Sequence, residues 1–189
     1  MDKAKAQNEI QALVNRFVSR QSDYETPDYL ERQLQNDFLN KLFKNLGWDV
    51  DNEKNLSTRE REVLVEKGDT KGRPDYSFRL NGEGVLFVEA KAASQGTENK
   101  EFIFQAKMYG WNSQNVNVTI LTDFKTFKVF DSSLKPDINK QGIGLIFELK
   151  CEDYAKSGFE KLWTFSKEEV ENGSLEKLFS KDAQSKRLR

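Results

Sequence analysis

Residues 74–91 read PDYSFRLNGEGVLFVEAK, and this stretch decides the fold. Two apolar runs flank an Asn-Gly-Glu-Gly break, which predicts a β-hairpin. Asp75 opens the first strand, and Glu89 and Lys91 close the second. Asp75 and Glu89 are symmetric about Gly82, so a three-residue loop at 81–83, or a bulge, would pair them on one face. A two-residue Asn-Gly turn alone would place them on opposite faces, and we therefore expect the longer loop.

The expected pairing brings two acids and a lysine together. Paired across the hairpin, the two carboxylates would lie roughly 5 Å apart at Cβ, with Lys91 on the same side of its strand. Two carboxylates at this separation repel each other, and a hard divalent cation bound between them removes that repulsion. Mg²⁺ binds carboxylate oxygens, backbone carbonyls and water, and a neighbouring lysine can orient water or neutralise a phosphate. This arrangement suits the hydrolysis of a phosphodiester.

Composition narrows the chemistry further. The chain has 189 residues, of which 37% are hydrophobic and 32% charged, with a net charge of −1, as expected of a globular protein. It contains no histidine, which excludes Ser-His-Asp and Cys-His catalysis and nucleases with a histidine base. One cysteine, Cys151, rules out a disulfide framework and suits a reducing cytoplasm. No stretch is apolar enough for a signal peptide or a membrane span.

The remaining pattern predicts one mixed α/β (α+β) domain, a central mixed sheet flanked by helices. Helices are expected at 3–21, at 26–46 with Thr26 as N-cap and Pro27 in the first turn, and at 100–111. Strands are expected at 61–65, in both arms of the hairpin, at 116–124, 126–133 and 145–150, with a turn at 68–73. Residues from 152 on are expected to be helical, with a capping box from Ser166 to Glu169 and a basic tail.

Pro74-Asp75, followed by Glu89-Ala90-Lys91, matches the motif of the PD-(D/E)xK nucleases, although a solvated strand edge would share it. Gln105 and Tyr109, four apart on the next helix, resemble the QxxxY pair of RecB-type members of that superfamily. By that resemblance Gln105 helps to position the lysine or the phosphate, and Tyr109 supports the site. The alternative is an ordinary amphipathic helix with Tyr109 in the core.

Glu31 stands at the end of the apolar stripe formed by Leu34, Phe38 and Leu42. A helix before the sheet often supplies such an acid in PD-(D/E)xK folds, and the alternative is a solvated first-turn glutamate that serves the helix dipole. The family often has a basic residue where Gln35 stands, so no role is assigned to Gln35.

The order of segments such as LGWDVDNE, FVEAK, YGWN and ILTDFKTFKVFD resembles the N-terminal nuclease region of type IIG restriction–modification enzymes. The nuclease region of type I restriction R subunits is similar. The resemblance implies a PD-(D/E)xK nuclease domain at 1–150, and a helical extension at 151–189 that begins the connector to a methyltransferase. It implies a chain that is one part of a longer enzyme or a separate nuclease subunit.

The resemblance further implies a cytoplasmic endonuclease that depends on Mg²⁺, for which Mn²⁺ would substitute. Asp75, Glu89, the carbonyl of Ala90 and Glu31 would hold the metal, and Lys91, Gln105 and Tyr109 would complete the catalytic set. Arg73, Lys100 and Lys107 are candidates for phosphate contacts, with solvated surface charges as the alternative. The substrate would be double-stranded DNA, cut on both strands through a transient dimer, while the methyltransferase and target-recognition parts lie outside this chain.

Two other readings stay open. One is a catalytically silent nuclease fold that binds DNA or a partner, against which the intact Asp, Glu and Lys argue. The other is a repair or junction nuclease of the RecB or resolvase kind.

Overall fold

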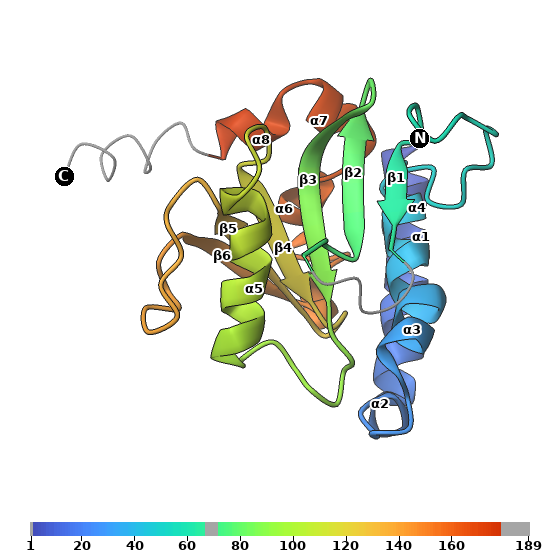
Figure 1. The fold of residues 1–189 in the computed structure, drawn as a ribbon. Helices are drawn as coiled ribbons and strands as arrows, with labels where there is room; N and C mark the ends of the chain where they lie inside the picture. The colour runs from blue at the N-terminus through green and yellow to red at the C-terminus, as the bar shows by residue number, and fades with distance from the viewer. Residues whose placement is uncertain (1, 67–71, 179–189) are drawn as a thin grey trace.

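The structure, a computed structural model, describes residues 2–66 and 72–178. Within these residues six strands form one sheet in the order in which they occur along the chain (Figure 1). Neighbouring strands are antiparallel, except that β3 and β4 are parallel because a helix connects them. The fold class, a mixed sheet flanked by helices, is confirmed. The strands are β1 (Val63–Val65), β2 (Tyr76–Leu80), β3 (Glu83–Ala90), β4 (Val118–Thr122), β5 (Thr126–Asp131) and β6 (Leu145–Lys150).

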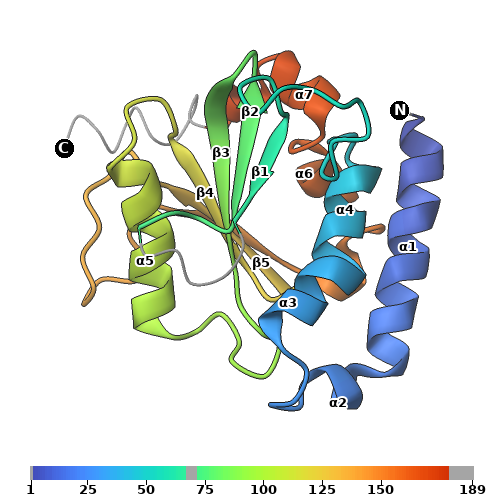
Figure 2. The ribbon, with the colours of Figure 1, turned by 45° about the vertical axis from the view of Figure 1, so that its right-hand side comes forward.

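Helices cover both faces of the sheet. Helix α5 lies on one face, and α1, α3 and α4 lie on the other (Figure 2). The N-terminal helices are α1 (Lys3–Ser19), α2 (Gln21–Tyr24), α3 (Glu31–Leu34), the π-helical turn η1 (Gln35–Leu39) and α4 (Asn40–Asn45). The later ones are α5 (Lys100–Trp111), η2 (Cys151–Asp153), α6 (Phe159–Trp163), α7 (Lys167–Glu171) and α8 (Ser174–Lys177).

The alternation of side chains along the strands produces two unequal cores. Tyr76 and Phe78 of β2 and Leu86 and Val88 of β3 are at most 1% exposed and pack toward α1 and α4. The opposite face has a much smaller apolar cluster beneath α5, formed by Ile103, Ala106, Leu121 and Phe130. Glu89 pairs with Leu121 across the parallel strands and therefore belongs to this second face. The polar residues of the hairpin thus lie where the hydrophobic layer is thin.

The hairpin turn corrects one expectation. Leu80 pairs with Glu83, so the turn consists of Asn81 and Gly82, both with positive φ, and the longer loop is wrong. A β-bulge between Phe78 and Arg79 then shifts the register by one residue. Beyond the bulge Tyr76 pairs with Val88, the last pair of the ladder, and the same register continued by one residue would set Asp75 opposite Glu89. The bulge that the sequence allowed as an alternative restores the common face.

The helix expected at 26–46 begins later than predicted. Residues 26–30 form a turn, and the first helical residue is Glu31, so Thr26 as N-cap is wrong. Instead the Gln33 side chain accepts a 2.8 Å hydrogen bond from the backbone N–H of Leu30. This single hydrogen bond satisfies the backbone donor of Leu30, the residue directly before the helix. The later start places Glu31 in the first turn.

The C-terminal residues pack into the main core. Cys151, Tyr154, Phe159, Leu162 and Phe165 belong to the same buried cluster as the sheet residues. Ser166 caps α7 by accepting from the Glu169 N–H at 3.3 Å, which is the Ser166 half of the predicted capping box. The boundary expected after residue 150 stays a prediction. The basic tail and most of the turn expected at 68–73 lie outside the described residues. None of the helices in the described ranges has the length and apolar character that crossing a bilayer requires.

Gly110 sets how closely α5 approaches the sheet, which gives a first prediction. A Cβ there would lie 2.0 Å from Ser132 Oγ and 2.4 Å from Ser132 Cβ. Gly110→Ala should therefore lower the free energy of unfolding by about 1–3 kcal/mol, even though alanine favours helices. Urea denaturation measures this change. Gly142→Ala is the control, since its Cβ would meet nothing within 4 Å. Equal destabilisation by the two substitutions would contradict the packing argument.

Candidate active site

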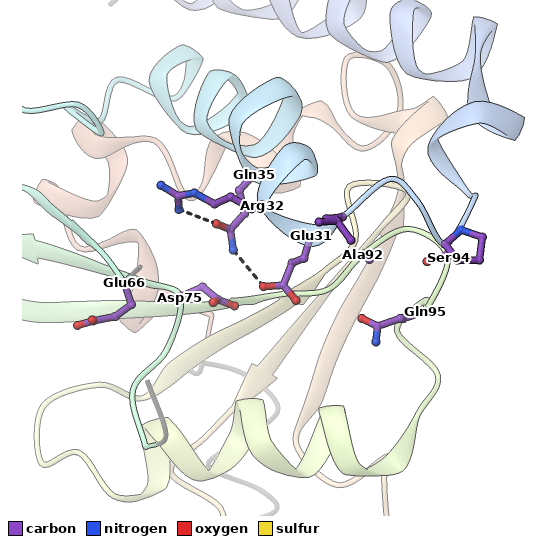
Figure 3. A pocket seen from close by; sticks show the side chains of 10 residues that line it. Glu31, Arg32, Gln35, Glu66, Asp75, Ala92, Ser94 and Gln95 are labelled. Atoms are coloured by element: carbon purple, nitrogen blue, oxygen red, sulfur yellow. Dashed lines mark hydrogen bonds between the residues drawn. The ribbon is translucent and has the colours of Figure 1, made fainter. Parts of the chain in front are cut away.

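A cavity of about 500 Å³ opens where β2 begins and where the first turn of α3 faces it (Figure 3). Asp75 lies on one side of this cavity, and Glu31 points toward it from the helix. The segment that follows Lys91 forms a further wall. The residues that line the cavity are Pro27, Leu30, Glu31, Arg32, Gln35, Glu66, Asp75, Ala92, Ser94 and Gln95.

Asp75 joins the two arms of the hairpin through its side chain. Its Oδ2 accepts a 2.7 Å hydrogen bond from the backbone N–H of Ala90. Its backbone oxygen accepts at 2.9 Å from the N–H of Glu66, which extends the contact with the segment after β1. The carboxylate is therefore held against the residue that follows Glu89. The contact ties the residue directly before β2 to the end of β3.

Glu89 is the most deeply buried acid of the group, at 4% exposure. Its Oε1 accepts a 2.7 Å bond from Lys91 Nζ. Its Oε2 is buried and has no hydrogen-bond partner among the residues that the structure describes. Burial, and then the charge of Asp75, raise the pKa of Glu89 to about 7. An acid with an unsatisfied buried oxygen beside a second acid is a place where a cation would lower the free energy.

Lys91 lies at the end of the strand with its side chain turned under α5. Its Nζ is 4.9 Å from the ring centroid of Phe102, and its side chain is 12% exposed. Its backbone N–H donates to Thr122 O at 3.0 Å, so the parallel ladder fixes the position of its Cα. Burial opposes the ammonium charge, but the ion pair with Glu89 outweighs it and raises the pKa of Lys91. Lys91 is therefore a cation at neutral pH.

The helix side of the cavity carries a chain of three polar residues. Gln35 Nε2 donates to Glu31 Oε1 at 3.2 Å, and Arg32 Nη1 donates to Gln35 Oε1 at 3.0 Å (Figure 3). The charge of Glu31 contributes to the raised pKa values of both Glu89 and Lys91. Glu31 thus belongs to the same electrostatic group as the hairpin acids, and its expected role as a metal ligand stays a prediction.

Gln105 and Tyr109 lie in a neighbouring cavity, together with Pro74 and Phe87. Gln105 is exposed and donates to the Tyr109 hydroxyl at 2.7 Å. Burial raises the pKa of Tyr109, and the charges of Glu89 and Asp75 add to the rise. Tyr109 is therefore within electrostatic reach of the acids, while the side-chain hydrogen bond of the pair joins Gln105 and Tyr109 to each other. Its expected role in positioning the lysine stays a prediction.

The prediction that Lys107 could contact a phosphate is wrong. Lys107 is 1% exposed, its Nζ lies 5.7 Å from the ring centroid of Phe130, and burial lowers its pKa. Arg73 and Lys100 are at the surface, where Arg73 Nη1 lies 3.3 Å from Glu66 Oε1. Only these two keep the accessibility that a phosphate contact needs.

The donor set fits a hard divalent cation in part. In residues 2–66 and 72–178 no three acidic, cysteine or histidine side chains gather as a preformed metal site. Asp75 and Glu89 nevertheless offer two carboxylates at one strand end, and the buried Oε2 of Glu89 lacks a partner among the described residues. Mg²⁺ is commonly held by one or two carboxylates, with water and substrate phosphates completing the shell. The residues therefore fit Mg²⁺ better than a metal that requires an all-protein cage.

The sequence did not indicate Gln35, Arg32, Glu66 or Gln95 as cavity residues. For Gln35 a signal existed. It stands four residues before Leu39 and eight before Phe43, so a polar residue occupies a row that is otherwise buried and apolar. No comparable signal marks Gln95, which reaches the cavity through the course of the segment after Lys91.

The chain is 35% identical, over 133 residues, to the type II restriction enzyme and methyltransferase RM.Eco57I of Escherichia coli. The chain is similar to part of a restriction enzyme. The match covers 67% of this chain and 13% of the other protein. No family model matches the chain, and no solved structure matches it.

The contribution of Asp75 to the raised pKa of Glu89 can be tested directly. Asp75→Asn keeps an oxygen for the Ala90 N–H but removes the charge. The pKa of Glu89 should then fall below about 7 while staying above its usual value, because burial, the larger cause, is unchanged. Carboxyl ¹³C NMR titration measures it. Asp37→Asn serves as the control, since Asp37 bonds Tyr29 instead. An unchanged Glu89 pKa in Asp75→Asn would show that the two acids do not interact.

Proposed function

We propose that this chain is the endonuclease domain of a restriction–modification enzyme, of the PD-(D/E)xK and type IIG kind, and that it hydrolyses phosphodiester bonds of double-stranded DNA. The observation that carries the proposal is the convergence of Asp75, Glu89 and Lys91 at the end of the hairpin. The similarity to part of a restriction enzyme supports it. By the same similarity, the methylating and target-recognising functions would belong to other parts of a longer enzyme that works in the cytoplasm.

Asp75, Glu89, the Ala90 carbonyl and Glu31 are the groups that would hold Mg²⁺, or Mn²⁺ in its place. The bound ion would supply charge neutralisation at the scissile phosphate and a more acidic water. Asp75 would be held in place by the Ala90 N–H, to which its Oδ2 is bonded at 2.7 Å. Glu89 would present Oε2, since Oε1 is occupied by Lys91. Asp75 is therefore oriented by its bond to Ala90, and Glu89 has a defined oxygen to offer, before any substrate arrives.

Lys91 would act as a charged donor. Its raised pKa favours the ammonium form at neutral pH, so Nζ suits donation to a phosphate oxygen or to the attacking water better than proton abstraction. Phe102 and Glu89 restrict its side chain, which limits the positions that Nζ can reach. Gln105 and Tyr109 would support the neighbouring stretch of the DNA backbone. Cleavage of both strands would need a transient dimer or two successive events.

Cleavage of plasmid DNA tests the proposal. Separated from recognition elements, the chain should nick supercoiled plasmid slowly, with Mg²⁺ or Mn²⁺, without sequence preference and with suppression by moderate salt. Lys91→Ala, Asp75→Ala and Glu89→Ala should each lower the rate by about 100-fold or more. Lys156→Ala, which changes an exposed lysine outside the cavity and outside the candidate phosphate contacts, is the matched control and should cleave like the wild type. Equal cleavage by wild type and Lys91→Ala would identify a contaminating nuclease. A chain that binds DNA without cutting it would support the alternative of a catalytically silent nuclease fold.

Metal binding should depend on pH with a defined sign. A cation at Glu89 must displace a proton below the pKa near 7 and need not do so above it. Millimolar Mn²⁺ should therefore raise the melting temperature by about 5 °C at pH 8, and by clearly less at pH 6. Differential scanning fluorimetry at matched ionic strength measures the effect. The same shift in Asp75→Asn/Glu89→Gln would place the bound ion elsewhere.

A further inference from the structure

Gln35 occupies a position that should be apolar. Glu31, Gln35, Leu39 and Phe43 follow one another at four-residue spacing, and the last three are buried. Gln35 is 2% exposed, although a buried primary amide destabilises a fold unless its hydrogen bonds are made. A hydrophobic residue of similar size would fill the same space at lower cost. The amide is therefore in need of an explanation beyond packing.

The hydrogen bonds of Gln35 determine which way its amide points. Arg32 can only donate, so the oxygen of Gln35 must face Arg32, as the 3.0 Å bond has it. The NH₂ group is then directed to Glu31 Oε1, 3.2 Å away. Glu31 belongs to a short first turn and has a flexible side chain, and this donor restricts the carboxylate to the cavity side (Figure 3). Arg32 thus fixes the orientation of the Gln35 amide, and the amide in turn fixes the position of the Glu31 carboxylate.

The backbone at Gln35 is also unusual. The N–H of Asn40 donates to the carbonyl of Gln35, five residues earlier, and this bond defines the π-helical turn Gln35–Leu39. Asn40 in turn accepts a 2.7 Å hydrogen bond from the hydroxyl of Tyr76, a residue with 0% exposure that follows Asp75 directly. One widened turn therefore begins with the residue that holds Glu31 and ends at the residue that anchors the strand of Asp75. The acids from the helix and from the hairpin are fixed through the same turn.

We propose that Gln35 is a positioning residue, whose amide holds the Glu31 carboxylate toward Asp75 across the cavity. The inference rests on the proposed nuclease function and adds to it a residue outside the Asp75, Glu89 and Lys91 group. Gln35 touches neither DNA nor metal in this account. It acts through Glu31, and it would be without effect in a chain that lacks the Glu31 carboxylate.

Gln35→Met tests the inference, because methionine matches the size and removes both hydrogen bonds. The variant should fold with an unchanged or higher melting temperature, yet cleave plasmid about 10-fold more slowly. It should also need more Mn²⁺ for half-maximal rate and show a smaller Mn²⁺-induced rise in melting temperature. Leu39→Met, one turn further along the same buried row, is the control for repacking and should match the wild type in every assay.

A double-mutant cycle with Glu31→Gln separates positioning from packing. If Gln35 acts through Glu31, adding Gln35→Met to Glu31→Gln should change neither the cleavage rate nor the Mn²⁺-induced melting shift further. Additive losses, or a Gln35→Met variant that equals the wild type while Lys91→Ala is inactive, would overturn the inference and leave the nuclease proposal standing. A wild type that neither cleaves nor responds to Mn²⁺ would overturn both. A Mn²⁺ response without cleavage, reduced by Gln35→Met, would keep the positioning role and remove the catalytic one.

Discussion

Two like charges held together at the end of a β-hairpin are the constraint on which the rest of the site depends. Asp75 is tied to the strand of Glu89 through the Ala90 N–H, and Glu89 is nearly buried beside it. Burial, and then the charge of Asp75, raise the pKa of Glu89, and its Oε2 has no hydrogen-bond partner among the described residues. A fold selected for stability alone would place apolar residues there, since uncompensated buried charge is among the most destabilising features of a protein.

The fold tolerates this charge because the two faces of the sheet differ. The face toward α1 and α4 carries the large aromatic core, in which Phe17 packs edge-on against Phe38, and Phe43 packs edge-on against Phe78. The face toward α5 carries a small apolar cluster, next to which Glu89 and Lys91 lie. Most of the hydrophobic stabilisation is therefore independent of the site. Residues of the site can change their charge or their ligands while the main core stays packed.

Much of the fold followed from the sequence, because periodic patterns report burial. The strand at Leu145–Lys150 and the helix at Lys100–Trp111 agree with the predicted bounds, and the register of the hairpin follows from the symmetry of Asp75 and Glu89 about Gly82. The turn did not follow, since Asn-Gly and a bulge together give the same register as a longer loop. The Asn81-Gly82 pair favours a two-residue turn, and only the common face of Asp75 and Glu89, at the far end of the hairpin, requires the bulge.

The helix side of the site was less predictable. A π-helical turn leaves no periodic signal, since it arises where tertiary contacts such as Tyr76–Asn40 outweigh the loss of regular hydrogen bonding. Thr26-Pro27 looks like a helix start in isolation, but the Gln33 side chain provides the cap four residues later. The family resemblance assigned no role to Gln35, because a resemblance predicts roles only for residues that the chain shares with the family. The polarity of Gln35 within a buried row was the physical clue.

The central claim is that Asp75 and Glu89 form a single cation site at the strand end. Crystals of the chain soaked with Mn²⁺, with diffraction recorded at the manganese absorption edge, test it most directly. The account predicts an anomalous difference peak within coordination distance of both carboxylates, beside the Ala90 carbonyl and on the cavity side of Glu31. A peak elsewhere, with Asp75 still bonded to the Ala90 N–H and Glu89 paired only with Lys91, would contradict it.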